Sequence, residues 1–418
     1  MKLSSTIMYC RSFAISEYEE LVIIANTNNG MNFKMTKECF LILDECIKSN
    51  KTLEMFFEQF EEQADREYFE RIIEVLLDYK IIVYEKEKAE FNVILELTNR
   101  CNLRCNHCCM DAMPVTESDE LSTREWKDVV DKLVGLSIQY VTITGGEPLV
   151  RKDFFEISEY VKARLNVPLL LMSNATLITE ENAPKLLELF EEFSFSLDGV
   201  SEETCAPVRG KGVFQRAMQG IEIMKSLGMN HFSLSFTKVK QNAAYTKEFK
   251  ELAESLGATP MIRSFDVVGR AKQHLELLPE DIDDQFRPHL SSGRDIEVHY
   301  YPENMPICAC CRAIDNKFCI SNTGDIYPCQ ALRYPEFLID NVKNIESLAS
   351  YFNNGKQYLT SGYEYFKEIH TAFSKKCADC PAKLFCENCV LYMYLMKHRE
   401  NFEELCDIKR KGLIEVWS

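Results

Sequence analysis

The alternation of short apolar runs with amphipathic stretches between residues 91 and 290 most constrains the fold of this chain. Six runs have the length and composition of buried strands. They are NVILELT (92–98), YVTITGG (140–146), VPLLLMSN (167–174), FSFSLDG (193–199), HFSLSFTKV (231–239) and MIRSFDVVG (261–269). Helical stretches separate them: one begins at the capping box of Ser122 and Glu125, and Gly228 and Gly257 lie where two others should end. The pattern predicts an α/β fold with a parallel sheet, either doubly wound or an open barrel.

The 18 cysteines of this 418-residue chain are unevenly distributed. Cys205 is the only cysteine between residues 110 and 307, whereas ten lie between 308 and 406. The N-terminus has no long apolar run, and no stretch approaches the roughly 20 apolar residues that a membrane span requires. We therefore expect a cytoplasmic protein, in which thiols stay reduced and clustered cysteines more often bind metal than form disulfides.

Composition and charge limit the partners of the chain. Its hydrophobic content of 46% and charged content of 27% are typical of a soluble globular protein, and its length suggests two or three domains. The formal net charge of -17 argues against nonspecific binding to nucleic acid or to an anionic membrane, because both require a positive field. We expect neither as a partner, which leaves a buried substrate or a short peptide.

The first block of the chain, residues 12–88, has the pattern of a small winged helix. EELVIIANTNNGMNFKM predicts a hairpin with an Asn29-Gly30 turn, three helical segments follow, and IIVYEK returns as a strand. The helical segments are 36–47, 52–60 and 65–80. A winged helix usually binds DNA, but residues 1–88 hold 17 acidic against 11 basic side chains. This is the opposite of the charge that a DNA-binding domain needs.

The last block, from about residue 300 to 418, is rich in cysteine and has the pattern of loops with short helices. We therefore predict three domains. They are a winged-helix-like domain at 1–88, a β/α domain at 89–295 and a cysteine-rich domain at 296–418.

Cys101, Cys105 and Cys108 follow the first predicted strand and indicate its chemistry. Their C-x3-C-x2-C spacing places three thiolates on one short loop, which can bind three irons of a 4Fe–4S cluster and leave the fourth open. Zinc usually takes four ligands, which this loop alone does not supply. Cys109 directly follows Cys108, so its side chain should point elsewhere, and we interpret it as a buried or spare thiol, with replacement of a neighbouring ligand as the alternative.

This loop, together with GGEP at 145–148 after the second strand, resembles radical S-adenosylmethionine (SAM) enzymes. The resemblance implies a partial (β/α)6 barrel, similar to a TIM barrel, in which SAM chelates the open iron. One electron from the cluster then cleaves SAM to a 5′-deoxyadenosyl radical, which abstracts hydrogen from an unreactive C–H bond. The protein would orient the cofactors and exclude water.

The resemblance also assigns SAM contacts to polar residues that follow the strands. They are Gly145, Gly146 and Glu147 for the SAM ammonium, Ser173 and Asn174 near the ribose, Ser196 and Asp198 as further ligand candidates, and Arg209 and His107. Arg209 stands where the family often places an arginine for the methionine carboxylate, which its planar fork suits. His107 replaces the usual aromatic residue and would stack near adenine, Ala175 replaces a common glycine, and GRA at 269–271 follows the sixth strand as in many members.

The cysteine-rich tail resembles the SPASM extension of radical SAM enzymes, which carries two auxiliary 4Fe–4S clusters. The resemblance assigns to the first cluster Cys308, Cys311, Cys329 and Cys389, and to the second Cys377, Cys380, Cys386 and Cys406. Cys310 is an alternative to Cys308, as is an open iron, and Cys319 is expected to pack. The pair in CENC is spaced more closely than the family usually has it, and C-x2-C…C-x2-C is also a zinc pattern, so zinc stays an alternative here.

An acidic winged helix ahead of such a core resembles the peptide-recognition domain of enzymes that mature RiPPs, which are ribosomally made and post-translationally modified peptides. In that family the leader of the precursor peptide adds as a strand to the edge of the hairpin, beside a helix. The resemblance implies a maturase that installs a carbon–carbon or thioether crosslink, using SAM and three 4Fe–4S clusters. Its partners would be the precursor peptide and an electron donor such as flavodoxin or ferredoxin.

Two other functions fit the sequence. A sulfatase-maturing enzyme, which oxidises Cys or Ser to formylglycine, shares the core and the tail but needs no leader-binding domain. A zinc-bearing regulatory protein with a peptide-binding winged helix belongs to a different class. The sequence does not single out a general acid or base: Glu96, Arg263 and Asp266 are candidates, and ion pairing within the barrel is their alternative role.

Overall fold

The computed structural model of the chain describes most of it and divides it into two units. The described residues are 1–278 except 11, 28, 85–89 and 114–118, then 311, 313–370, 374–386, 389–397, 403, 406, 407 and 410. The barrel unit comprises residues 89–287 and 313–365, and the end unit comprises 1–88, 288–312 and 366–418. Both predicted domain boundaries, after residues 88 and 295, lie outside the described residues and stay predictions.

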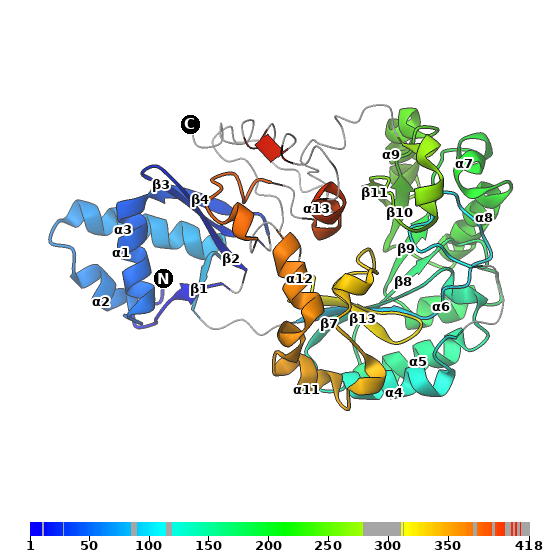
Figure 1. Cartoon of the computed structure of the whole chain (residues 1–418), viewed down its shortest axis with the longest axis horizontal. Coiled ribbons are helices and arrows are strands. Elements are labelled where there is room, and N and C mark those ends of the chain that lie inside the picture. The colour runs from blue at the N-terminus through cyan, green and yellow to red at the C-terminus, as the bar shows by residue number, and fades with distance from the viewer. Residues whose placement is uncertain are drawn as a thin grey trace. The chain divides into compact units, whose positions relative to one another are not determined.

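The barrel unit is built on one nine-stranded sheet (Figure 1). Its order is β11-β10-β9-β8-β7-β6-β12-β13-β14, and all pairs from β11 to β12 are parallel. The first six strands of the chain in this sheet are β6 (Phe91–Glu96), β7 (Ile138–Thr144), β8 (Leu169–Ser173), β9 (Glu192–Ser196), β10 (Phe232–Thr237) and β11 (Thr259–Arg263). All six predicted strands are therefore confirmed.

Helices connect these strands on one side of the sheet. They are α4 (Thr123–Leu133), α5 (Phe154–Leu165), α6 (Ala183–Leu189), α7 (Glu202–Arg209), α8 (Val213–Ser226) and α9 (Thr246–Ser255). The order of β6 to β11 never reverses, so right-handed crossovers place the helices that cover the sheet on the same face, whereas α7 packs with residues that follow β10 and β11. Figure 1 shows α4, α5, α6 and α8 along the outside of the strands. This order is that of an open barrel and excludes the doubly wound alternative.

Local sequence explains where these helices begin and end. At the start of α4, Ser122 and Glu125 form the predicted capping box, and the apolar stripe that follows is buried against the sheet. Each of its large side chains contributes about 1.5–3 kcal/mol by leaving water. Gly228 and Gly257 follow α8 and α9 with φ of 98° and 75°, a conformation that favours glycine and ends both helices as predicted.

Residues 313–365 of the predicted third domain extend the barrel sheet. Strand β12 (Lys317–Ile320) pairs in parallel with β6, placing Cys319 opposite Ile94, and β13 (Asp325–Tyr327) and β14 (Asp340–Asn341) follow in antiparallel fashion. Cys319 is fully buried, as expected. This segment is part of the barrel unit because its first strand completes the ladder of β6.

The remaining helices are short or lie near the C-terminus. The α-helices are α11 (Leu348–Asn353), α12 (Ser361–Ile369) and α13 (Val390–Lys397). The 3-10 helices are η1 (Pro148–Val150), η2 (Ala243–Tyr245), η3 (Gly269–Gln273), η4 (Leu275–Leu277), η5 (Pro335–Phe337), η6 (Val342–Asn344), η7 (Lys356–Leu359) and η8 (Lys375–Cys377). Among the described residues, no helix has the length and apolar character that crossing a membrane requires.

The N-terminal part of the end unit contains two small sheets and three helices. The elements are β1 (Met8–Tyr9), β2 (Phe13–Tyr18), β3 (Leu21–Asn26), β4 (Asn32–Thr36), α1 (Lys37–Lys48), α2 (Leu53–Glu58), α3 (Gln63–Asp78) and β5 (Ile82–Val83). The predicted hairpin is β3–β4, and the three predicted helices are present. Strand β2 adds to the hairpin, and the returning strand β5 pairs with β1 instead. The winged-helix assignment stays a prediction.

Strand β3 is apolar on both faces because both faces of its sheet are covered. Val22 and Ile24 lie in the core that the three helices form. Ile23 and Ala25, on the opposite face, pack against residues 382–385 near the C-terminus, where Leu384 and Phe385 are buried. The continuous run LVIIA therefore belongs to a strand buried on both sides.

Candidate cluster and cofactor site

The three cysteines of the C-x3-C-x2-C motif lie together on the loop that follows β6. Cys105 and Cys108 are both close enough to Cys101 to raise the pKa of its thiol, which burial, the largest cause, raises to about 12. The backbone N–H of Leu103 donates to Cys101 Sγ at 3.3 Å and that of Ala112 donates to Cys108 Sγ at 3.4 Å. Such bonds support thiolates, the form that binds iron. Cys109 directly follows Cys108, and its role as a buried or spare thiol stays a prediction.

This arrangement fits a cluster better than a single ion. In the described part of the chain, no three His, Cys, Asp or Glu side chains converge closely enough to hold one metal ion. In a 4Fe–4S cluster each thiolate binds its own iron, so the sulfurs need to surround the cluster without converging on a point.

The two glycines of GGEP bring the loop after β7 against the start of the cysteine loop. Gly146 N–H donates to Thr98 O at 2.8 Å, and Glu147 N–H donates to Arg100 O at 2.9 Å. A Cβ on Gly145 would lie 2.3 Å from Thr98 O, and one on Gly146 would lie 2.4 Å from Arg100 O. Only glycine permits this backbone contact, which sets the height of Cys101 above the sheet.

The Glu147 carboxylate joins the loop after β7 to the end of β8. It is fully buried and accepts hydrogen bonds from Ser173 Oγ at 2.9 Å, Asn174 N at 2.7 Å and Leu149 N at 3.2 Å. Burial nevertheless dominates and raises its pKa to about 7. Asn174 Nδ2 in turn donates to Asn102 Oδ1 at 3.0 Å, so this chain of contacts returns to the cysteine loop.

Asp198, His107 and Arg209 form a buried charged group beside Cys105. Asp198 Oδ2 lies 2.7 Å from Arg209 Nε and 3.0 Å from His107 Nε2, and its Oδ1 accepts from Thr237 N at 2.6 Å. Burial opposes ionisation of Asp198, but Arg209 and His107 outweigh it and lower the pKa of this carboxyl to about 2. Arg209 Nη1 lies 3.9 Å from Cys105 Sγ. A fixed positive charge therefore stands next to the thiols.

The structure brings most of the predicted SAM contacts to the carboxyl ends of neighbouring strands. Gly145, Gly146 and Glu147 follow β7, Ser173 ends β8 with Asn174 after it, and Ser196 ends β9. Ala175 adopts the left-handed conformation, with φ of 61°, that the glycine common in the family would favour.

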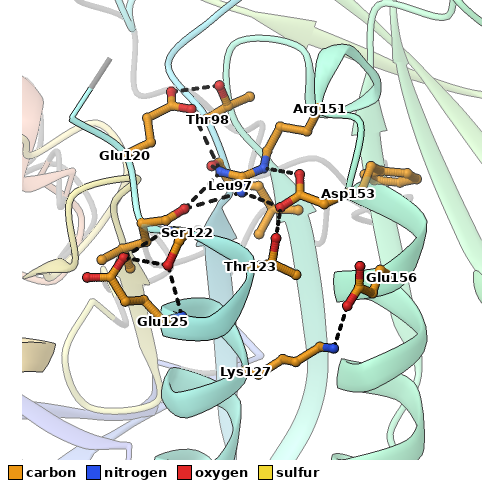
Figure 2. Close-up of polar contacts among 12 residues, drawn as sticks. Leu97, Thr98, Glu120, Ser122, Thr123, Glu125, Lys127, Arg151, Asp153 and Glu156 are labelled. Carbon is orange, nitrogen blue, oxygen red and sulfur yellow. Dashed lines mark hydrogen bonds and ion pairs between the residues drawn. The ribbon is translucent and has the colours of Figure 1, made fainter. Parts of the chain in front are cut away.

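Two buried residues that sequence reasoning missed hold the start of the cysteine loop (Figure 2). Glu120 accepts from Thr98 Oγ1 and from Asn99 N, both at 2.7 Å, and from Arg100 Nε at 3.1 Å. Arg151 donates to Leu97 O at 2.8 Å and pairs with Asp153 Oδ2 at 2.7 Å. The available signal in the sequence was the position of Arg151 just after GGEP. That position does not indicate that the side chain reaches residues 97–100.

Arg270, in the GRA segment, holds the other end of the cysteine loop. Its Nη1 donates to Cys105 O at 3.0 Å, its Nη2 donates to Ala112 O, and its backbone N–H donates to Cys108 O at 3.0 Å. The side chain is 6% exposed and also pairs with Asp111 at 3.3 Å. A Cβ on the preceding Gly269 would meet Cys109 O at 2.3 Å. The GRA segment thus packs directly on the loop.

The structure describes seven of the eight predicted auxiliary-cluster cysteines; Cys308 lies outside the described residues, as does the alternative Cys310. In the end unit, Cys377 is close enough to Cys380 and Cys406 for both to raise the pKa of its thiol, after burial as the largest cause. Cys386 packs beside Cys380 on the face formed by Ile23 and Ala25. For the other set, Cys311 and Cys389 lie in the end unit and Cys329 in the barrel unit. Their assignment stays a prediction.

Comparison with known proteins gives a consistent family. The Radical SAM superfamily model matches residues 95–253. Mycofactocin maturase MftC of Mycolicibacterium smegmatis is 30% identical over 302 residues, covering 68% of this chain and 74% of that protein. An AdoMet-dependent heme synthase of Oleidesulfovibrio alaskensis is 29% identical over 345 residues, covering 74% and 85%.

Among solved structures, Streptococcus suis SuiB bound to S-adenosylmethionine has a TM-score of 0.55 at 16% identity, covering 94% of this chain and 98% of SuiB. SuiB bound to the precursor peptide SuiA has a TM-score of 0.53 at 14% identity, covering 94% and 97%. These likenesses show a shared fold. The three grouped thiols, the adjacent buried arginine and the parallel strand order fit a 4Fe–4S cluster with SAM beside it. The chain belongs to the radical SAM superfamily of enzymes.

Proposed function

We propose that this enzyme is a peptide maturase that binds a precursor peptide through its leader and installs a carbon–carbon or thioether crosslink. The observation that carries the proposal is the similarity to mycofactocin maturase over 68% of the chain. It is supported by the common fold with SuiB, which has been crystallised with its precursor peptide. The likeness to SuiB extends over 94% of the chain.

In the proposed site, Cys101, Cys105 and Cys108 hold the catalytic cluster and the backbone of Gly145 and Gly146 faces SAM. When bound, the cluster and SAM supply a 5′-deoxyadenosyl radical that abstracts hydrogen from the peptide. Arg209 receives the methionine carboxylate, since its charge lies 3.9 Å from Cys105 Sγ and is oriented by Asp198. Glu147 holds Ser173 and Asn174 in place, and its carboxylate is also the proposed partner of the SAM ammonium.

The predicted auxiliary clusters and the electron supply belong to the same proposal. Two further 4Fe–4S clusters, bound by the cysteines of the tail, would accept the electron that crosslink formation releases. A small reductant such as flavodoxin or ferredoxin would supply the electron that starts the reaction. We propose a cytoplasmic setting, where these thiols stay reduced.

The leader is proposed to add to the outer edge of β4. The hydrogen bonds from Asn26 N to Met31 O and from Lys37 N to Glu20 O fix the pairing of β3 with β4. By the antiparallel alternation, Lys34 is then in a non-hydrogen-bonded pair, so its N–H and C=O point away from β3. On the other edge of the sheet, the hydrogen bond from Thr27 N to Ser12 O fixes the pairing of β2 with β3. By the same alternation, the N–H and C=O of Glu17 point away from β3, at the outer edge of β2.

Proline at these two positions gives a matched test of leader binding. Lys34→Pro removes an outward donor from β4 and leaves the β3 ladder intact, while Glu17→Pro does the same on β2. The probe is a synthetic candidate precursor peptide, and affinity is measured by fluorescence anisotropy. We expect a loss of about tenfold or more for Lys34→Pro only, which corresponds to roughly one or two hydrogen bonds. Equal affinity of both variants would exclude the β4 edge.

The chemistry is tested with the same peptide and anaerobically reconstituted enzyme. We expect 5′-deoxyadenosine to form with SAM and dithionite, and the peptide to lose two hydrogen atoms for each crosslink, as measured by mass spectrometry. Conversion of a Cys or Ser side chain to an aldehyde would favour the sulfatase-maturing alternative instead. A colourless protein that contains zinc would favour the regulatory alternative for the tail.

A tetrapyrrole substrate is a second candidate function. It is favoured by the AdoMet-dependent heme synthase relative, which covers 74% of this chain. Incubation with an iron porphyrin precursor of heme separates the two candidates, because a change in the mass of the porphyrin with the peptide unchanged would favour the tetrapyrrole substrate.

A further inference from the structure

The cysteine loop is held at both ends by buried charged side chains, two of which, Arg151 and Arg270, lie far from the loop in sequence. At the start, Glu120 is 6% exposed and Arg151 is 5% exposed. At the end, Arg270 is 6% exposed. None of these three side chains is among the residues assigned above to SAM or to iron. Each instead bonds the backbone that carries the thiols.

At the start of the loop, Glu120 orders three groups at once. Its carboxylate accepts from the Thr98 hydroxyl, the Asn99 N–H and the Arg100 guanidinium, and it lies 3.7 Å from Arg151 Nη1. Figure 2 shows Glu120 directed at Thr98 while Arg151 reaches Leu97 and Asp153. The last residues before Cys101 are therefore fixed by bonds that a neutral side chain cannot fully replace.

At the end of the loop, the planar fork of Arg270 spans two carbonyls that no single-point donor could bridge. Its two Nη atoms reach Cys105 O and Ala112 O, one on each side of Cys108. Backbone carbonyls in such a buried position cost about 1–3 kcal/mol each if they lose their donor. The charge of Arg270 also lowers the pKa of the Cys105 thiol, although burial, the largest cause, raises it overall.

We propose that Glu120 and Arg270 are positioning residues of the catalytic cluster. They preset the loop so that Cys101, Cys105 and Cys108 stand at the three cluster positions and the fourth side stays open toward SAM. Glu120 acts on the height of Cys101 through Asn99 and Arg100, and Arg270 acts on Cys105 and Cys108 through their carbonyls. The inference rests on membership of the radical SAM superfamily and is independent of the proposed peptide substrate.

The test uses full-length, anaerobically reconstituted enzyme and needs no peptide. The variants are Glu120→Gln, which keeps the shape but removes the charge, and Arg270→Lys, which keeps the charge but removes the fork. Arg164→Gln is the matched control, because Arg164 makes a surface ion pair with Asp131 and is 46% exposed. Three quantities are measured: the rate of iron release to a chelator, the change in the electron paramagnetic resonance spectrum of the reduced cluster on adding SAM, and hydrogen exchange.

Both variants are expected to release iron about tenfold faster than wild type, which corresponds to losing one buried hydrogen bond to a charged group. They should also show a smaller SAM-induced spectral change, and faster exchange over residues 97–113 while α8 stays protected. Arg164→Gln should match wild type. Unchanged release and spectra in both variants would overturn the inference. Loss of protection in α8 as well as in the loop would also overturn it, because it would show a general structural role.

Discussion

At the scale of single residues, Glu96 is a buried carboxylate whose partners only partly offset its burial. It ends β6, is fully buried, and lies 3.2 Å from Arg333 Nη1. Among the described residues, neither of its oxygens has a nitrogen or oxygen hydrogen-bond donor in good geometry. Burial is the largest cause of its shift and raises its pKa to about 7, against the lowering effects of Arg333 and Cys319.

This shift predicts how stability changes with pH. In the unfolded chain Glu96 ionises near its ordinary pKa of about 4.3, whereas in the folded chain it holds its proton up to about pH 7. The folded state therefore binds more protons in this window, and the stabilisation is present below pH 4 and lost as pH rises to 7. The loss should be roughly 2–4 kcal/mol. Denaturant titrations of wild type and Glu96→Gln across pH 4–8 check this. The free energy of unfolding of the variant should lack the part of its pH dependence that comes from Glu96.

If the difference in the free energy of unfolding between wild type and Glu96→Gln stays constant over that pH range, Glu96 ionises at its ordinary pKa. Asp266→Asn is a suitable control, since Asp266 is exposed. The sequence suggested Glu96 as one of three acid or base candidates but gave no means to rank them. Burial and the position of Arg333, 237 residues later in the chain, distinguish it from Arg263 and Asp266, which are both exposed.

Residues with a fixed spacing were predictable and those without one were not. The three cysteines and GGEP each follow a strand, so strand order alone brings them together, whereas Arg209 ends helix α7. Arg151, Glu120 and Arg270 bind backbone carbonyls and N–H groups, which any residue provides, so no pattern in the sequence marks their partners. His107 was expected near adenine, and its bond to Asp198 depends on the packing of β9 against the cysteine loop.

At the scale of elements, the sheet β2-β3-β4 has a second buried face whose covering segment the sequence did not identify. The hairpin was predicted because alternation and the Asn29-Gly30 turn are local signals. The cover on the other side comes from residues 382–385, and Ser16 Oγ donates to Pro381 O at 3.0 Å. An apolar run such as LVIIA shows that a strand is buried on both sides but does not identify the covering segment.

Removing one large side chain from this cover should destabilise the end unit. Phe385 is 1% exposed, so Phe385→Ala is expected to cost about 3–5 kcal/mol through lost burial and the cavity left behind. Hydrogen exchange should increase in both 13–26 and 377–386. Leu359→Ala, at a side chain that is 83% exposed, should change the free energy of unfolding by less than about 0.5 kcal/mol. Faster exchange confined to 377–386 would contradict the packing.

Strand β12 is a second element whose partner in the fold the sequence did not identify. Its sequence, KFCI, is short and was interpreted as part of a cysteine-rich domain of loops. It pairs in parallel with β6, which lies more than 200 residues earlier in the chain. Strand β6 pairs with β7 on one edge and with β12 on the other. The pairing of β12 therefore depends on how the whole barrel places that second edge, which no local pattern in the sequence indicates.

At the scale of the whole molecule, the number of clusters is open to measurement. With three 4Fe–4S clusters, wild type should bind about 12 iron atoms per chain. The triple variant Cys101→Ala, Cys105→Ala, Cys108→Ala should bind about 8 and produce no 5′-deoxyadenosine from SAM with dithionite. Iron analysis and chromatography of the products check both expectations. Cys39→Ala, outside all predicted ligand sets, should keep both at wild-type values.

An iron content near 4 in wild type, with zinc making up the difference, would replace the auxiliary clusters by structural metal. Retained SAM cleavage in the triple variant would contradict the assignment of the cysteine loop. The two results are separable, because the first concerns the tail and the second concerns the loop after β6.

The end unit is assembled from both termini of the chain, and this has a consequence for synthesis. Ser16 and its partner Pro381 are 365 positions apart. On the ribosome, β2 and β3 are synthesised long before residues 382–385. Ile23 and Ala25 therefore stay exposed to water, or bound to a chaperone, until translation is nearly finished. A nonsense mutation late in the gene should therefore expose an adhesive apolar strand near the N-terminus, and the truncated product should aggregate through its earliest-made part.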